Sequence, residues 1–267
     1  MNRDFPSLFK NHKIPTLDKI DIVQPSTSFN STLESKQPET KAVMKWIQDN
    51  SFVLSISFHG GAVGAFWPYD DGSCQNDTPC ISATPDNELM KVLATKFACS
   101  HADMHLGGGC NGKYIFPKGV SNGAMWYPID GSMTDYNYLF SNCFEITVEL
   151  TCCKYPFAKH LMPEWRKNQQ SLVQFLHMAH MGIKGLITDE NGDRVSGAKV
   201  EILGNAKKVT TNKRGEFWRL LLPGRYQVQA WGLCVGDTCK RSKIIGIEVK
   251  TDKPTIVNLI LSTKGLV

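Results

Sequence analysis

Hydrophobic residues in the first two thirds of the chain recur at helical spacing in three stretches and form short continuous runs in two others. The helical spacing predicts helices over residues 38–50, 87–104 and 163–180. The apolar runs predict strands over residues 52–58 and 144–150. A helix, a buried strand and a glycine-rich loop in this order are typical of a mostly parallel sheet, whose functional residues collect beyond the carboxyl ends of strands. This part of the chain is therefore expected to form an α/β domain around a mostly parallel sheet.

Each predicted helix has an apolar face that should point into the core. These faces consist of Val43, Met44 and Ile47, then Leu89, Leu93 and Phe97, and finally Trp165, Leu172, Phe175 and Leu176. The polar residues 1–37 and the turn-rich residues 68–85 are expected to be loops. Residues 106–135 are rich in glycine and lack a clear period, which predicts a long loop that acts as a lid or binding wall.

The pattern changes sharply after residue 180. Short strand-like segments follow one another, separated by the turn signals Asn191-Gly192, Arg214-Gly215 and Pro223-Gly224. Strands without long helices predict a small β-sandwich over residues 181–267, following a first domain over residues 1–180.

Composition narrows the possible partners. Hydrophobic residues make up 42% and charged residues 21% of the 267 residues, with a formal net charge of +5. No Lys/Arg block is long enough for a nucleic-acid-binding arm, so no nucleic-acid partner is expected. No apolar run is long enough to predict a transmembrane segment, and the first residues do not form a signal peptide.

The nine cysteines point to an oxidising compartment. Cys74 and Cys80 flank one short polar loop and Cys234 and Cys239 flank another, which predicts two small disulfide-closed loops. Cys152 and Cys153 should each need a distant partner. The odd count predicts one unpaired thiol or a partner outside the chain. Sequons at Asn30 and Asn76 are glycosylation candidates. We therefore expect an extracellular or secretory-pathway protein, and we do not expect Met1 to be its natural N-terminus.

Two residues at strand ends could carry chemistry. Glu149 shares one face of its strand with Glu145 and Thr147, because side chains alternate along a strand. Glu149 is a candidate general base, or else a structural carboxylate paired with Arg or Lys. His59 ends an apolar strand before Gly60-Gly61 and is either a metal ligand or a loop histidine held by a carbonyl group.

Other candidates lie in loops. Asn2 and Arg3 could bind a carboxylate, the alternative being a solvated loop charge. Asp70 could select a cationic side chain, although turns also favour Asp. Tyr127 could reach a substrate through its hydroxyl group or could simply pack within its loop.

Several motifs together resemble the zinc metallocarboxypeptidases. They are NRDFPSLF at 2–9, SFHGGAVGAFWPYDD at 57–71, GVSNGAMWYPIDGSMTDYNYLFSNCFEITVELTCCKYP at 119–156, EWRKNQQSL at 164–172 and HMGIKGLITDENGDRVSGAKV at 180–200. The order and the following β-sandwich resemble the regulatory branch that includes carboxypeptidases D, E, M and N. The resemblance implies an α/β, mixed-sheet carboxypeptidase domain (an α/β-hydrolase-like exopeptidase domain), present in part over residues 1–180, and a transthyretin-like β-sandwich over residues 181–267.

The resemblance also implies roles for individual residues. His59 corresponds to the third ligand of a Zn²⁺ ion, and Glu149 to the general base that takes a proton from water. Asn2 and Arg3 correspond to the pair that binds the C-terminal carboxylate of a peptide. Asp70 corresponds to the acidic residue that selects C-terminal Lys or Arg, and Tyr127 to the mobile tyrosine that covers the substrate.

The chain departs from this family in ways that bear on activity. The HxxE motif with the first two zinc ligands, and the arginine that stabilises the oxyanion, precede the NRNFP-like segment in the family and are missing from this sequence. Thr134 stands where the branch usually has Gln, and Asp4 replaces an Asn. Since one histidine cannot hold a catalytic zinc ion, this chain is expected to be inactive, with an incomplete zinc site.

Two main functional hypotheses follow. The first is a zinc-dependent metallocarboxypeptidase that removes C-terminal Lys or Arg from peptides or proteins, of which this chain is a fragment; the intact binding residues favour it. The second is a truncated, non-catalytic paralogue that binds peptides outside the cell. A third possibility is that the β-sandwich is itself the functional module, as a folding or docking domain.

Overall fold

The computed structural model describes residues 2–7, 35–72, 78–235, 238–251 and 253–262. Its backbone contacts divide the chain into two compact units. Of the described residues, the first unit takes 2–7, 35–139 and 143–179, and the second takes 140–142 and those from 180 onward.

The first unit is built around a four-stranded mixed sheet with strand order β1-β4-β2-β3. These strands are β1 (Leu54–His59), β4 (Phe144–Glu149), β2 (Gly64–Trp67) and β3 (Val120–Asn122). The β1–β4 and β2–β3 pairs are parallel, and β2 is antiparallel to β4. The buried β4 therefore lies inside the sheet, with β1 at one edge.

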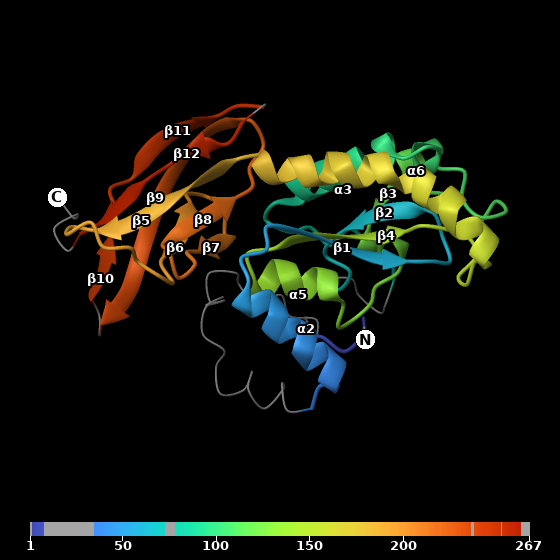
Figure 1. The fold of residues 1–267 in the computed structure, drawn as a ribbon, viewed down its shortest axis with the longest axis horizontal. Coiled ribbons are helices and arrows are strands. Elements are labelled where there is room, and N and C mark those ends of the chain that lie inside the picture. The colour runs from blue at the N-terminus through green and yellow to red at the C-terminus, as the bar shows by residue number, and fades with distance from the viewer. Residues whose placement is uncertain (1, 8–34, 73–77, 236–237, 252, 263–267) are drawn as a thin grey trace. The chain divides into compact units, whose positions relative to one another are not determined.

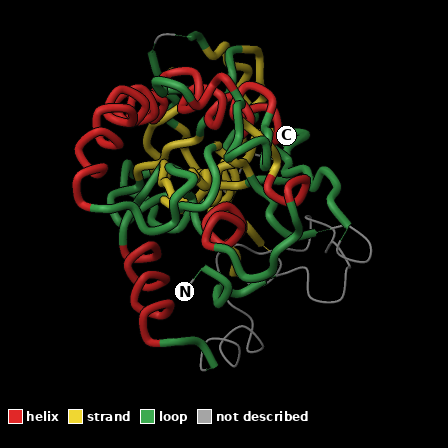
Figure 2. The backbone as a smooth tube through the Cα atoms, turned by 90° about the vertical axis from the view of Figure 1, so that its right-hand side faces the viewer, coloured by secondary structure: helices red, strands yellow, loops and turns green. Residues whose placement is uncertain are grey.

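Helices lie on both faces of this sheet, with α3 and α6 on one face and α2 and α5 on the other (Figure 1). The helices are α2 (Pro38–Asp49), α3 (Asn87–Ser100), α4 (Gly123–Trp126), α5 (Met133–Phe140) and α6 (Ala158–His177), with 3-10 turns η3 (Met104–Leu106), η4 (Pro117–Gly119) and η5 (Met178–His180). The flanking of strands by helices can also be followed in Figure 2. The prediction of an α/β domain around a mixed sheet is confirmed for this unit.

The predicted helix faces agree with the structure in α2 and α3 but not throughout α6. Met44 and Ile47 of α2 are buried, as are all three predicted core residues of α3. In α6, however, Trp165 is 52% exposed and Leu176 is 67% exposed. The buried residues of α6 are Asn168, Ser171 and Phe175, so polar side chains fill much of the inner face. The prediction of a simple apolar stripe was wrong in α6, because the inner face admits small and amide side chains.

The glycine-rich region at residues 106–135 is more structured than predicted. It contains η4, β3, α4 and the start of α5 rather than one long loop. Glycines there make close approaches possible: Gly119 has φ of 71°, and a Cβ atom would lie 2.2 Å from the carbonyl oxygen of Met104. Strand β2 was not predicted from the sequence. Its four residues, Gly-Ala-Phe-Trp, are too few to show a period and include no β-branched residue.

The second unit is a β-sandwich. One sheet has the order β10-β9-β6-β7 with β11 paired to β9, and the other has the order β12-β5-β13 with β8 paired to β5. The strands are β5 (Ile183–Asp189), β6 (Lys199–Ile202), β7 (Lys208–Thr210), β8 (Glu216–Arg219), β9 (Gly224–Val235), β10 (Thr238–Arg241), β11 (Ile245–Val249), β12 (Thr255–Ile256) and β13 (Leu259–Leu261). Residues of both sheets form one apolar core. The predicted sandwich architecture is confirmed.

Among the described residues, no helix combines the length and apolar character that a membrane span requires.

Candidate active site

Strands β1 and β4 carry a row of paired polar residues that runs along the strands to their carboxyl ends. Their parallel register places Ser55 beside Glu145, Ser57 beside Thr147 and His59 beside Glu149. Because side chains alternate along a strand, these residues share one face of the sheet. His59 and Glu149 are the last residues of their strands, the position at which α/β sheets present functional groups.

A small cavity lies where this row ends. All six residues that the sequence nominates for catalysis, substrate binding or metal binding line it, namely Asn2, Arg3, His59, Asp70, Tyr127 and Glu149. The remaining lining residues are Phe66, Gly123, Trp126, Ile129 and Thr147. Its volume is about 20 Å³, which is room for about one water molecule. A larger ligand would therefore require movement of the residues at its mouth.

His59 and Glu149 face each other within this cavity. His59 Nδ1 lies 3.7 Å from Glu149 Oε1, and Asn2 Nδ2 lies 2.9 Å from His59 Nε2. The buried Glu149 Oε2 has no hydrogen-bond partner among the described residues. An unpaired buried carboxylate oxygen is costly, and it marks the place where a water molecule or a ligand would be favourable.

Burial shifts the pKa values of both groups toward their neutral forms. Burial raises the pKa of Glu149 to about 7, although the positive charges of Lys154 and Arg3 act against this shift. Burial also lowers the pKa of His59, and Arg3 and Lys154 lower it further. Near neutral pH the site therefore combines a neutral imidazole with a carboxyl group that can both accept and return a proton.

The N-terminal residues are held beside the cavity by the loop that precedes α5. Asn2 Oδ1 accepts a hydrogen bond of 2.7 Å from the Met133 amide, and the Phe5 amide donates to the Gly131 carbonyl at 3.1 Å. Gly131 has φ of 73°, and a Cβ atom there would lie 2.7 Å from the Arg3 carbonyl oxygen. Glycine is therefore required for this close approach. The exposed Arg3 side chain is left near the cavity mouth.

Asp70 presents a buried carboxyl group to the cavity. Asp135 fixes the turn that carries it, because its carboxyl oxygens accept the backbone amides of Asp70 at 2.8 Å and Asp71 at 3.0 Å. Gly123 lies directly against this carboxyl group, since a Cβ atom there would lie 1.8 Å from Asp70 Oδ1.

The charge state of Asp70 depends on its surroundings. Burial raises its pKa to about 6, while a hydrogen bond from Ser132 and the positive charge of Arg3 oppose the increase. The pKa of the neighbouring Asp135 is also raised, first by burial and then by the charge of Asp70. A cation bound in the cavity would stabilise the ionised form of Asp70.

Tyr127 stands at the end of an aromatic wall. Trp126 stacks on Phe66 with ring centroids 4.8 Å apart and meets Tyr127 edge-on at 4.7 Å. Tyr127 follows α4 and is 42% exposed, whereas Phe66 is buried. The tyrosine ring is therefore supported from one side and open to solvent on the other.

Sequence reasoning did not nominate the other five residues of the cavity wall. Thr147 could have been found, because it shares the β4 face with Glu149 at a spacing of two residues. Phe66, Trp126 and Ile129 gave no signal, since lining a cavity and packing in a core require the same apolar residue types.

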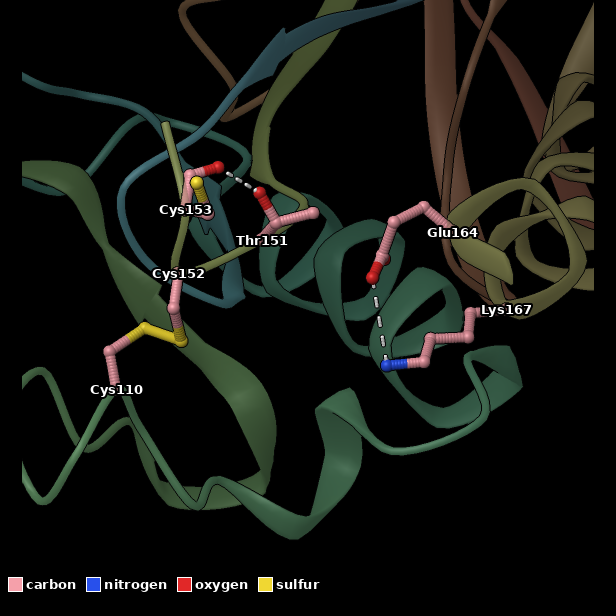
Figure 3. Close-up of a disulfide and its surroundings, with 6 residues drawn as sticks. All are labelled: Cys110, Thr151, Cys152, Cys153, Glu164 and Lys167. Carbon is pink, nitrogen blue, oxygen red and sulfur yellow. Dashed lines mark hydrogen bonds and ion pairs between the residues drawn. A yellow bond between two sulfur atoms is a disulfide. The ribbon is translucent and has the colours of Figure 1, made fainter. Parts of the chain in front are cut away.

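The cysteines only partly match the predictions. Cys152 does have a distant partner, Cys110, but Cys153 is an exposed thiol whose side chain points away from that disulfide (Figure 3). Cys99 is a second exposed thiol, and Cys143 is a buried thiol that donates a hydrogen bond to Ser55 Oγ at 3.2 Å. More than one described cysteine therefore lies outside a disulfide within the chain, whereas the odd count predicted one.

The predicted small disulfide loops can be followed only in part. Cys80 and Cys239 are disulfide-bonded, and the backbone of Cys234 pairs with Cys239 across β9 and β10. Cys74 and both sequons, Asn30 and Asn76, lie outside the described residues.

A second, larger cavity of about 630 Å³ lies beside the disulfide. It is lined by Cys152, Cys153, Phe157, Glu164 and Lys167 among others, and by none of the nominated site residues. Figure 3 shows Glu164 and Lys167 as an ion pair on its helical side, at 3.8 Å. The chemistry is therefore concentrated in the smaller cavity.

Comparison with protein-family models decides the family. The zinc carboxypeptidase model matches residues 1–171, which is more than half of the chain and includes every residue that lines the smaller cavity. The chain belongs to the zinc carboxypeptidase family. The model of a carboxypeptidase regulatory-like domain matches residues 182–262, which correspond to the β-sandwich.

Individual carboxypeptidases agree with this assignment. The chain is 46% identical to carboxypeptidase D of Drosophila melanogaster, over 86% of this chain and 15% of that protein. It is 41% identical to the carboxypeptidase N catalytic chain of Mus musculus, over 86% of this chain and 50% of that protein. Carboxypeptidase M of Mus musculus is 38% identical, over 85% of this chain and 48% of that protein. The chain thus spans at most about half the length of these relatives.

The family implies a zinc ion, but the described residues do not complete a site for one. Catalytic zinc usually has three protein ligands. No group of three or more His, Cys, Asp or Glu residues in the described part of the chain is arranged to hold a metal ion. His59 is the one candidate ligand among the nominated residues, and the unpaired Glu149 Oε2 lies beside it.

Proposed function

We propose that this chain carries the substrate-recognition half of a carboxypeptidase site for peptides or proteins that end in Lys or Arg. The observation that supports this most directly is that six residues from five separate parts of the sequence line a single cavity. The cavity offers the cation of Arg3, the amide of Asn2, the buried acid Asp70, the hydroxyl group of Tyr127 and the carboxyl group of Glu149, whose pKa is about 7. These groups suit the substrate of an exopeptidase.

The last residue of the substrate would be held at two charged groups, its terminal carboxylate and its basic side chain. Arg3 offers two parallel N–H donors to the terminal carboxylate, and Asn2 lies beside it. Asp70 lies deeper, is 4% exposed, and would pair with the ammonium or guanidinium group of the last residue. Tyr127, open to solvent on one side, would close over the bound residue.

Glu149 would act as the proton carrier. In its ionised form it can take a proton from a water molecule at its unpaired Oε2, and in its protonated form it can give that proton to the leaving amine. Its pKa of about 7 suits both steps near neutral pH. Zinc-dependent removal of C-terminal Lys or Arg is proposed on this basis, with His59 as one ligand.

A second candidate function is peptide binding without hydrolysis, by a non-catalytic paralogue. The observation that favours it is that the described residues contain no complete metal cluster. In either case we propose an extracellular or secretory-pathway location, supported by the Cys110–Cys152 disulfide and by disulfide-bonded Cys80 and Cys239.

The two candidates are separated by measuring zinc content and product release on the purified full chain. One tightly bound zinc ion per chain, with release of C-terminal Arg that Glu149→Gln abolishes, supports the enzyme. Binding of Arg-ended peptide without zinc or release supports the binding protein. Failure to bind Arg-ended peptide in the presence of zinc contradicts both.

A further inference from the structure

A chain of buried hydrogen bonds runs behind the cavity and ends at its wall. Glu145 and Thr134 are both fully buried, and the Thr134 hydroxyl donates to Glu145 Oε1 at 3.3 Å. Thr134 Oγ1 also lies 2.6 Å from Thr147 Oγ1. Thr147 lines the cavity, so Glu145 is connected to the binding site through two hydroxyl groups.

The other oxygen of Glu145 already accepts two donors. Ser55 Oγ donates to Glu145 Oε2 at 2.5 Å, and the Asn137 side-chain amide donates to the same atom. Any change in the direction of hydrogen bonding must therefore occur at Oε1, on the side of Thr134.

The direction of this chain follows from counting hydrogen atoms. An ionised carboxylate only accepts, so Thr134 donates its single hydroxyl hydrogen to Glu145. Thr134 must then accept from Thr147, whose hydroxyl hydrogen is used. Thr147 consequently presents only lone pairs to the cavity. A neutral group that donates to Thr134 would reverse both bonds and point a hydrogen atom of Thr147 into the cavity.

We propose that Glu145 is a positioning residue that fixes the direction of the Thr134–Thr147 hydrogen bond, so that the cavity wall accepts hydrogen bonds from a cationic substrate side chain. Asp70 supplies the negative charge of the cavity, and Thr147 supplies a second acceptor beside it. This inference rests on the proposed recognition of C-terminal Lys or Arg and adds a residue that never touches the substrate.

The test compares two peptides that differ only in the side-chain amine of the last residue. One ends in Lys and the other in norleucine, and their affinities for the full chain are measured by calorimetry at pH 8. In Glu145→Gln, the amide oxygen must face Ser55 and Asn137, so the amide N–H₂ donates to Thr134. We expect the preference for Lys over norleucine to fall roughly tenfold, the usual effect of one hydrogen bond to a charged group, while norleucine affinity stays within about twofold.

Two further variants keep the test decisive if Glu145→Gln does not fold. Thr134→Val removes the connecting hydroxyl and should cause the same loss of preference, whereas Thr134→Ser should retain the wild-type preference. An unchanged Lys preference in both Glu145→Gln and Thr134→Val would overturn the role of Glu145 alone. A wild-type chain that does not distinguish the two peptides would instead contradict the proposed function, and the inference would fall with it.

Discussion

The two units of the molecule bury different chemistry. Five carboxyl groups are buried among the described residues, and all of them belong to the first unit: Asp70, Asp86, Asp135, Glu145 and Glu149. The described residues of the sandwich bury no carboxyl group; the sandwich has an apolar core, and its buried charged side chains are the cations Lys207 and Arg219. Since burying a carboxyl group is costly, the first unit gives up stability to hold acids inside, and the second does not.

The buried acids of the first unit are not equivalent. Asp86 accepts the Tyr138 hydroxyl at 2.8 Å, and Asp135 accepts two backbone amides. These partners explain their burial structurally. Glu149 differs because its Oε2 is left without a partner in the described residues. The comparison therefore separates acids that hold the fold together from the acid that is available for chemistry.

The largest expected effect tests the apolar side of the comparison. Phe217 of β8 is 1% exposed in the sandwich core, and Phe217→Ala should lower the stability of this unit by about 3–5 kcal/mol. Ile260→Ala is the matched control, because Ile260 of β13 is 59% exposed and should change stability by no more than about 0.5 kcal/mol. Hydrogen exchange of β5 and β8 amides measures both. Equal effects would show that the core is not where the stability lies.

The next effect tests the acidic side through pH. Burial raises the pKa of Glu145 from 4.5 to about 7, although hydrogen bonds from Ser55, Asn137 and Thr134 oppose the shift. A raised folded-state pKa contributes stability below pH 4.5 that is lost as the pH rises to about 7. The free energy of opening β4 should therefore fall by about 3 kcal/mol over this range from Glu145 alone.

Glu145→Gln should remove that part of the slope and leave the parts due to Asp70 and Glu149. Native-state hydrogen exchange of β4 amides at pH 5 and pH 7.5, corrected for intrinsic exchange rates, measures it. The same slope in Glu145→Gln and wild type would mean that Glu145 does not titrate in this window.

A smaller effect compares two tightly packed glycines. A Cβ atom on Gly185 of the sandwich would lie 1.7 Å from the Val257 carbonyl oxygen, whereas one on Gly123 would meet the Asp70 side chain at 1.8 Å. Gly185→Ala pushes against backbone and should destabilise its sheet by about 1–3 kcal/mol. Gly123→Ala should mainly displace the Asp70 carboxyl group and weaken binding of Lys-ended peptide.

Gly246→Ala is the control for both substitutions, since no heavy atom lies within 4 Å of its Cβ position. Thermal unfolding and calorimetric binding distinguish the outcomes. Loss of stability without loss of binding in Gly123→Ala would contradict the placement of Asp70 in the binding cavity.

The smallest effect is expected at surface ion pairs of either unit. Lys45 and Asp49 on α2 are 76% and 56% exposed, and Arg214 and Glu216 in the sandwich are 76% and 28% exposed. Lys45→Met and Arg214→Met should each change stability by less than about 1 kcal/mol, because water and salt screen such pairs. A larger loss on urea unfolding would show that exposed charge, rather than buried chemistry, distinguishes the units.

The elements that could be predicted from the sequence are those that follow from the periodicity of apolar residues and from the order of segments along the chain. The α3 face, the β1 and β4 runs and the sandwich strands all follow from local patterns of apolar residues. Alternation along β4 also placed Glu145 and Glu149 on one face of the strand. Family resemblance, rather than spacing, assigned the roles of Asn2, Arg3 and Asp70, which come from loops that lie far apart in the sequence.

Other features could not be read from the sequence, because they depend on neighbours in space. The burial of Asn168 and Ser171 in α6 reflects the surface that the helix meets, which its own periodicity does not describe. The choice of Cys110 as the partner of Cys152 depends on how the chain folds over 42 residues. The hydrogen bonds that join Glu145 to the cavity likewise connect α5 to β4.

The matched register of β1 and β4 also restricts how this sequence can change over evolutionary time. Inserting or deleting one residue in the middle of either strand would turn the following side chains to the opposite face of the sheet. His59 or Glu149 would then leave the cavity even though every residue type was preserved. Length changes should therefore be tolerated only in the flanking loops, whereas substitutions within the strands alter the site one residue at a time.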